Sequence, residues 1–306
     1  MTEMLSYDFM RRALLAALLV GVTAPAVGIY LVQRRQALMG DGIGHVALTG
    51  VGLGLVFQTS PVWMAVLVCV LAAVVMELVR ARGNQRGDIA LAMLFYGGMA
   101  CGRLLISKAP AATGTSGSLD SYLWGSILAV DSTDLLTIGA LGALVVAVTL
   151  GLRRQLFAVC QDEEFAKVSG VPVRLLNLLL AVTAAVTVTV AMRVVGLLLV
   201  SALMVVPVAA AQLLTRSFAA TQALAIAIGV AVSLGGVATS YRTDVPPGSA
   251  IVLLAIALFA LFSLLAAPLA RRRHRSSVPP QAGAPREEPV TVAVREDPVG
   301  SARLAQ

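Results

Sequence analysis

Residues 13–33 read ALLAALLVGVTAPAVGIYLVQ and contain no charged side chain. At a rise of 1.5 Å per residue, about 20 such residues cross the hydrocarbon core of a bilayer. The basic pair Arg11 and Arg12 before this run is also typical of a cleaved signal peptide. Because the apolar run continues beyond the usual short core of a signal peptide, we interpret it as an uncleaved first span.

The whole chain has the composition of a membrane protein. Hydrophobic residues make up 58% of it and charged residues 13%, whereas soluble domains carry about 25% charged residues. Continuous apolar runs exclude the alternating pattern of barrel strands. We therefore predict an all-α, polytopic transmembrane helical bundle with eight or nine spans, the second and seventh being short, glycine-containing and open to a break or tilt. The nine apolar windows are about 13–33, 42–59, 62–79, 88–107, 133–152, 175–192, 194–214, 219–239 and 249–269.

The basic residues are concentrated in alternate loops, which the positive-inside rule places in the cytoplasm. The N-terminus is then outside and the C-terminal tail inside, although Arg11 and Arg12 act against this placement. The net charge of +7 is thus interpreted as a topology pattern rather than as nucleic-acid binding. The cytoplasmic set is Arg34, Arg35, Arg80, Arg82, Arg86, Arg153, Arg154, Lys167, Arg174, Arg216, Arg271, Arg272, Arg273 and Arg275.

Three regions follow from this pattern. Residues 1–12 form an N-terminal segment, and residues 13–270 form the transmembrane domain with a cytoplasmic loop at about 153–174. Residues 271–306, including His274, are rich in proline and charge and lack apolar periodicity, so we expect a disordered cytoplasmic tail. The long external loop 108–132 is expected to contain a short interfacial helix near Tyr122.

The stretch RRQALMGDGIGHVALTGVGLG, residues 34–54, holds Asp41 and His45 four residues apart. On a helix this spacing places both side chains on one face. An ionisable group inside a membrane is costly and marks a functional site by default. Carboxylate with imidazole suits Zn²⁺, Mn²⁺ or iron. The alternative is an Asp–His pair that only caps and locks the start of the second helix, and Glu77 is the remaining ionisable candidate at depth.

The cytoplasmic stretch QDEEFAKVSGVPVRLLN, residues 161–177, predicts a short helix that Gly170 ends and a span that Pro172 opens. A permease needs such a helix to receive force from a separate motor subunit, although an ordinary connector would look similar. The chain has no G-x-x-x-x-G-K-[ST], H-E-x-x-H or G-x-S-x-G motif. We therefore expect neither ATP hydrolysis nor another enzymatic activity from this chain, and no permanently bound cofactor.

Five motifs occur in order and together resemble the permease family of ATP-binding-cassette importers for zinc and manganese. They are RRQALMGDGIGHVALTGVGLG, YLWGSILAVDSTDLL, DEEFAKVSGVPVRLLN, AMRVVGLLLVSALMVVPVAAAQLLTRS and YRTDVPPGSAIVLLA. The resemblance covers about residues 10–268.

The resemblance assigns roles by position. It implies that Asp41 and His45 hold the metal ion in the pathway, and that Asp244 in the last external loop serves metal access or loop order. Pro207 matches a motif proline in the seventh span. The chain departs from the family pattern at two positions: Gly44 stands where serine or alanine is common, and Thr49 stands where proline is common. Neither change removes a metal ligand. Docking of the ATPase is implied for Glu164, Ala166 and Gly170.

The expected function is that of a multi-pass permease subunit in a bacterial cytoplasmic membrane, moving a divalent transition metal with zinc favoured over manganese or iron. Its expected partners are a cytoplasmic ATP-binding-cassette ATPase, an extracytoplasmic metal-binding protein, membrane lipid and a second copy of the chain in a homodimer, with no nucleic acid. The alternative is an ion-coupled secondary metal carrier, in which Asp41 and His45 would relay protons.

Overall fold

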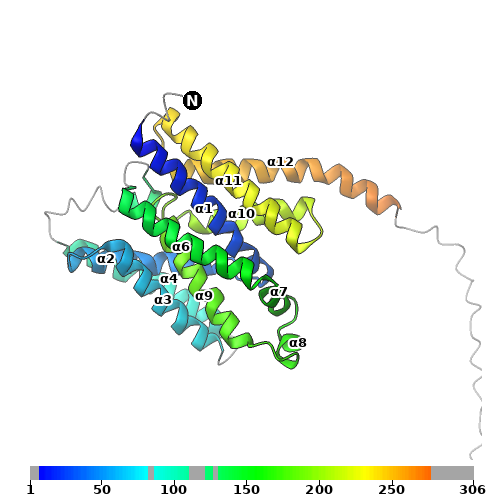
Figure 1. The fold of residues 1–306 in the computed structure, drawn as a ribbon, viewed down its shortest axis with the longest axis horizontal. Coiled ribbons are helices and arrows are strands. Elements are labelled where there is room, and N and C mark those ends of the chain that lie inside the picture. The colour runs from blue at the N-terminus through cyan, green and yellow to red at the C-terminus, as the bar shows by residue number, and fades with distance from the viewer. Residues whose placement is uncertain (1–6, 82–85, 110–120, 127–129, 277–306) are drawn as a thin grey trace, which may run out of the picture. The chain divides into compact units, whose positions relative to one another are not determined.

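The structure is a computed structural model that describes residues 7–81, 86–109, 121–126 and 130–276 (Figure 1). Every regular element within these ranges is a helix, and eight helices are long and apolar enough to cross a membrane. The all-α polytopic bundle predicted from the sequence is therefore confirmed. The eight are α1 (Asp8–Gln33), α2 (Met39–Val56), α3 (Pro61–Arg80), α4 (Arg86–Lys108), α6 (Ser132–Gly151), α9 (Val173–Ala191), α11 (Phe218–Thr243) and α12 (Pro247–Ser276). Three shorter helices are α7 (Arg153–Gln161), α8 (Glu163–Val168) and α10 (Val200–Leu214).

Residues 1–266 form one compact unit, and α12 continues beyond it to Ser276. The predicted domain boundary at residue 270 thus falls inside this helix. The rest of the expected tail, residues 277–306, lies outside the described residues, and its disorder stays a prediction.

Helix α1 lies at the centre of this unit, where it packs against α11, α10, α6 and α9 (Figure 1). Its alanines and glycines allow close approach of neighbouring backbones: a Cβ on Gly28 would collide with the carbonyl of Met204 on α10. The buried hydroxyl of Tyr30 donates a hydrogen bond of 2.8 Å to the carbonyl of Thr149 on α6. α1 is thus a tightly packed element of this unit and is one of the helices long and apolar enough to cross a membrane.

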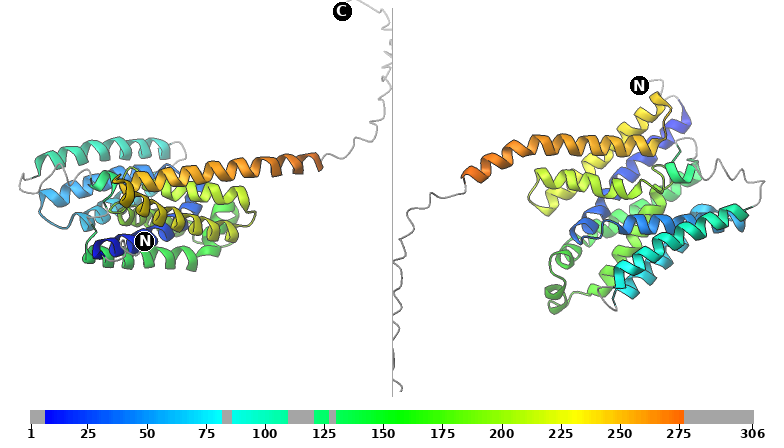
Figure 2. Two further views of the ribbon diagram at one scale, coloured as in Figure 1. Left: turned by 90° about the horizontal axis from the view of Figure 1, so that it is seen from above. Right: turned by 180° about the vertical axis from the view of Figure 1, so that it is seen from behind.

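Helices α2, α3 and α4 pack against one another along one side of the unit (Figure 2). α3 also packs against α9, and α2 contacts both α9 and α10. The group is thereby joined to the α1-centred part of the core, with α2 at the junction.

Ion pairs and hydrogen bonds group the loops at two ends of the bundle, as the charge pattern predicted. At one end Arg12 pairs with Asp131 at 3.3 Å, and Arg193 pairs with Asp134. At the other end Arg34 contacts residues of α8 and α9. Each group holds only residues expected on the same side of the membrane, so the structure agrees with the predicted sorting.

The seventh apolar window is broken, as its glycine had suggested. Residues 192–199 form turns, Gly196 has a φ of 90°, and α10 begins only at Val200. The amide of Leu197 donates to the carbonyl of Tyr122 at 2.9 Å, and the amide of Ser126 donates to the carbonyl of Arg193 at 3.3 Å. Backbone groups that leave a helix at membrane depth need such partners. Residues 121–124 are helical, which agrees with the first part of the interfacial helix expected near Tyr122.

Candidate functional site

Asp41 and His45 lie in the first turns of α2, at the junction of the two helix groups. Both side chains are half-buried, whereas the intervening Gly42, Ile43 and Gly44 are buried. The expected helical spacing therefore holds: the two side chains share the less buried face of α2, while the helix as a whole packs against α4, α9 and α10.

The carboxylate of Asp41 accepts a hydrogen bond from the hydroxyl of Ser201 on α10. This contact orients one carboxylate oxygen of Asp41. It also places the hydroxyl oxygen of Ser201 beside the pair, as a further atom that could bind a metal. Sequence reasoning missed Ser201, because a single hydroxyl in an apolar window does not reveal which helix it faces. Its place near the start of the broken seventh span was the only indication.

His45 is held from the side of α4. Its ring meets the ring of Phe95 edge-on, with centroids 4.1 Å apart at an interplanar angle of 63°. A Cβ built on Gly98 would lie 2.8 Å from the carbonyl carbon of His45, so glycine permits this close approach. The hydroxyl of Thr49 donates to the carbonyl of Gly98 at 2.8 Å. α4 therefore fixes the backbone that carries the imidazole.

Within the described part of the chain, no third His, Cys, Asp or Glu joins Asp41 and His45 in a group able to hold a metal. Glu77 belongs elsewhere, since it lies 3.8 Å from Arg80 at the end of α3. The chain thus offers one carboxylate, one imidazole and the hydroxyl of Ser201. Carboxylate and imidazole are donors that first-row transition metals accept, but a complete coordination shell needs more ligands.

The predicted coupling residues lie on or beside α8, a short helix with defined ends. The side chain of Asp162 caps it by accepting from the amide of Phe165 at 2.9 Å, and Gly170, with a φ of 78°, follows its last turn. Ala166 is buried, whereas Glu164 is exposed and accepts a hydrogen bond of 2.8 Å from Lys167. That hydrogen bond raises the pKa of the Lys167 ammonium. The docking role of Glu164, Ala166 and Gly170 stays a prediction.

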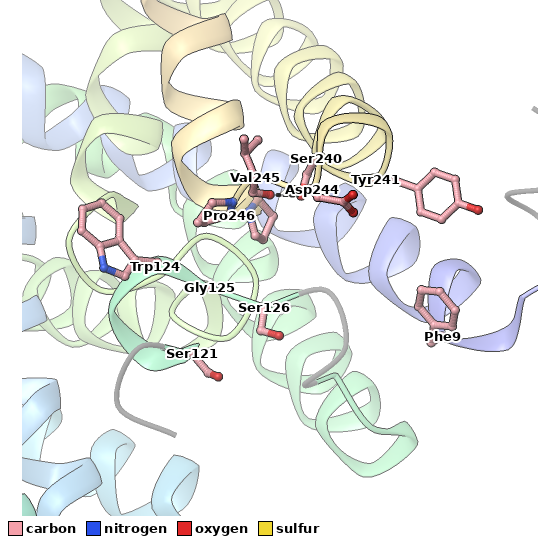
Figure 3. Close-up of a pocket in the computed structure, with 11 residues that line it drawn as sticks. Phe9, Ser121, Trp124, Gly125, Ser126, Ser240, Tyr241, Asp244, Val245 and Pro246 are labelled. Carbon is pink, nitrogen blue, oxygen red and sulfur yellow. Dashed lines mark hydrogen bonds between the residues drawn. The ribbon is translucent and has the colours of Figure 1, made fainter. Parts of the chain in front are cut away.

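Asp244 lies at the opposite end of the bundle, directly after α11, in the left-handed backbone region with a φ of 52°. It lines an open cavity of about 630 Å³ together with Trp124, Tyr241 and other residues (Figure 3). The hydroxyl of Ser240 donates to the carbonyl of Val245 at 2.6 Å and orders the turn beside it. The three predicted groups of site residues therefore occupy three separate places: the half-buried Asp41–His45 pair, the α8 region and the cavity at the end of α11.

Comparison with known proteins finds similar proteins that align over most of their own length with this chain. The chain is 34% identical over 259 residues to the "Manganese transport system membrane protein MntC" of Halalkalibacterium halodurans, covering 85% of this chain and 88% of that protein. It is 30% identical over 259 residues to the "Probable iron transport system membrane protein" of Haemophilus influenzae, covering 85% of this chain and 94% of the relative. Among solved structures, PsaBC from Streptococcus pneumoniae in complex with Fab superposes with a TM-score of 0.76 at 30% identity, over 85% of this chain and 94% of that one.

The profile of the ABC 3 transport family matches residues 6–266, which is the whole helical unit that carries Asp41, His45, α8 and Asp244. This match and the relatives agree with the ordered motifs that suggested an ATP-binding-cassette permease. The chain is a multi-pass membrane protein and belongs to the ABC 3 transport family.

Proposed function

We propose that this chain is the permease subunit of an ATP-driven importer that moves a divalent transition metal across the cytoplasmic membrane. The observation that carries the proposal is the Asp41–His45 pair, half-buried inside a helical bundle and held by Ser201 and Phe95. Placing an aspartate and a histidine there costs stability, and the cost is explained if the pair replaces part of the hydration shell of a passing cation.

Manganese is the first ion to test. Relatives of this chain are named for manganese and for iron. One carboxylate, one imidazole and one hydroxyl accept Mn²⁺, Fe²⁺ and Zn²⁺ alike, and affinity order alone rarely sets selectivity in cells. The zinc preference inferred from the sequence stays a prediction that the same assay can test.

A second copy of the chain would complete the site. Two protomers related by a twofold axis would present two Asp41 and two His45 side chains, a four-ligand set that binds a cation yet can release it. An ABC ATPase would dock at α8, and an extracytoplasmic binding protein would deliver the metal at the end that carries Asp244.

The test is uptake of Mn²⁺ by cells that express the permease with its ATPase and binding protein. The proposal predicts uptake that is lost when the Walker lysine of the ATPase is replaced, while the permease level in the membrane is unchanged. Uptake that continues without a working ATPase, and that collapses when the proton gradient is dissipated, would contradict the proposal and favour a secondary carrier.

A further inference from the structure

Arg34 joins three elements at the end of the bundle that carries α8. It caps the C-terminus of α1, and its side chain is only 8% exposed. The guanidinium donates to Asn177 Oδ1 on α9 at 2.6 Å and to Glu163 Oε2 on α8 at 3.2 Å. Because Glu163 is the first residue of α8, the arginine is attached directly to the short helix in the cytoplasmic loop.

A tight turn links Arg34 to the helix that carries the Asp41–His45 pair. Arg35 has a φ of 58°, and the amide of Gln36 donates back to the carbonyl of Leu31 at 2.8 Å. The amide of Met39 then donates to the carbonyl of Gln36 at 2.9 Å, at the start of α2. These hydrogen bonds connect the end of α1, which Arg34 caps, to the first turn of α2, which contains Asp41.

The other side of α8 is open to a partner. Phe165 is 68% exposed and Val168 is 88% exposed, whereas Ala166 between them is buried. Exposed apolar side chains on a short charged helix suit contact with another protein. The face with Phe165 and Val168 can therefore receive a push from a docked subunit, while Glu163 connects the same helix to Arg34.

We propose that Arg34 is a positioning residue that couples α8 to the Asp41–His45 pair. In this mechanism the ATPase moves α8, and the Glu163–Arg34 ion pair transmits this movement to the turn between α1 and α2. The geometry of the Asp41–His45 pair changes as a result. The proposal rests on the proposed function, because it needs an ATPase docked at α8. A purely structural ion pair would instead hold the loop in place and affect only folding and assembly.

The test uses the complete transporter, with permease, ATPase and binding protein, in proteoliposomes supplied with Mn²⁺. For Arg34→Gln we expect the Mn²⁺ transported per ATP hydrolysed to fall about tenfold, a typical coupling between two sites, while the ATPase still copurifies and hydrolyses ATP. Arg35→Gln is the matched control, because it removes the same charge from the exposed neighbouring residue; it should retain the wild-type ratio.

A charge exchange separates coupling from folding. Arg34→Glu and Glu163→Arg should each uncouple transport. The double variant should recover part of the transport per ATP, because the ion pair is restored in reverse; recovery is partial because Glu163 also pairs with Lys167 at 3.6 Å and Arg34 also donates to Asn177. The inference is overturned if Arg34→Gln keeps the wild-type ratio, or if the single variants lose assembly and thermal stability and the exchange restores those without restoring the ratio. A wild-type complex that hydrolyses ATP without moving Mn²⁺ would overturn the proposed function instead.

Discussion

Ser201 on α10 donates a hydrogen bond to Asp41 on α2, although the two residues are 160 positions apart in the chain. The contact ties the broken seventh span to the residue most suited to bind a cation. The break before Val200 places Ser201 in the first turn of α10.

Replacing Ser201 by alanine should weaken metal transport. A hydrogen bond to a charged group contributes about 1.5–3 kcal/mol, so we expect the concentration of Mn²⁺ needed for half-maximal uptake to rise roughly tenfold or more. Ser107→Ala is a suitable control, because that exposed hydroxyl donates to the carbonyl of Leu104 within its own helix. Equal uptake by Ser201→Ala and wild type would show that this hydroxyl has no part in holding the carboxylate.

Two adjacent glycines of α4 allow a matched test of the packing around His45. A Cβ on Gly98 would lie 2.8 Å from the backbone of His45, whereas a Cβ on Gly97 would meet nothing within 4 Å. Overpacking typically costs about 1–3 kcal/mol, so Gly98→Ala should lower the thermal unfolding temperature of the purified permease. Gly97→Ala should leave it unchanged or slightly higher, because alanine favours helices. Similar unfolding temperatures for the two variants would contradict the close approach of α2 and α4.

The two ion pairs at the end that carries Asp244 should contribute unequally to stability. Arg193 and Asp134 have side chains only 18% and 17% exposed, whereas those of Arg12 and Asp131 are 33% and 69% exposed. Arg193→Gln leaves a partly buried carboxylate without its partner and should cost about 3 kcal/mol, whereas Arg12→Gln should cost about 1 kcal/mol or less. Thermal unfolding of both variants in the same detergent measures the difference, and equal shifts would contradict it.

Cys160 on α7 should react slowly with maleimides. Burial raises the pKa of its thiol to about 11, so the thiolate that attacks the reagent is scarce at neutral pH. In a variant that retains only this cysteine, after Cys69→Ala and Cys101→Ala, labelling should be slow at pH 7 and accelerate as the pH rises toward the raised pKa. Denatured protein is the control and should label quickly. Rapid labelling of the folded protein at pH 7 would show that the thiol is more accessible than the structure indicates.

Much of the fold was predictable because hydrophobicity is local information. The apolar windows located the spans. Glycine content agreed with the break in the seventh window, at Gly196, but not in the second, which forms the unbroken helix α2. The windows could not show that α1 begins as early as Asp8 or that α12 continues to Ser276, since polar and basic residues extend a helix without adding to its hydropathy.

The candidate site was predictable only in part. Asp41 and His45 stand out because ionisable residues are rare in apolar runs, and their spacing is a property of one helix. Ser201, Phe95 and Arg34 could not be assigned, because their roles depend on contacts between different helices. The sequence pattern can indicate that a residue lies against another helix, but it does not identify that helix.

The most direct test of the central claim is the metal content of metal-starved cells lacking the gene, measured by elemental mass spectrometry after complementation. Wild type, Asp41→Asn and His45→Ala would be compared at equal levels of permease in the membrane. The account predicts that wild type restores the cellular content of manganese, or of zinc or iron, and that both variants fail to do so. Full restoration by both variants would contradict it, because Asp41 and His45 would then serve the structure of α2 and not the passage of metal.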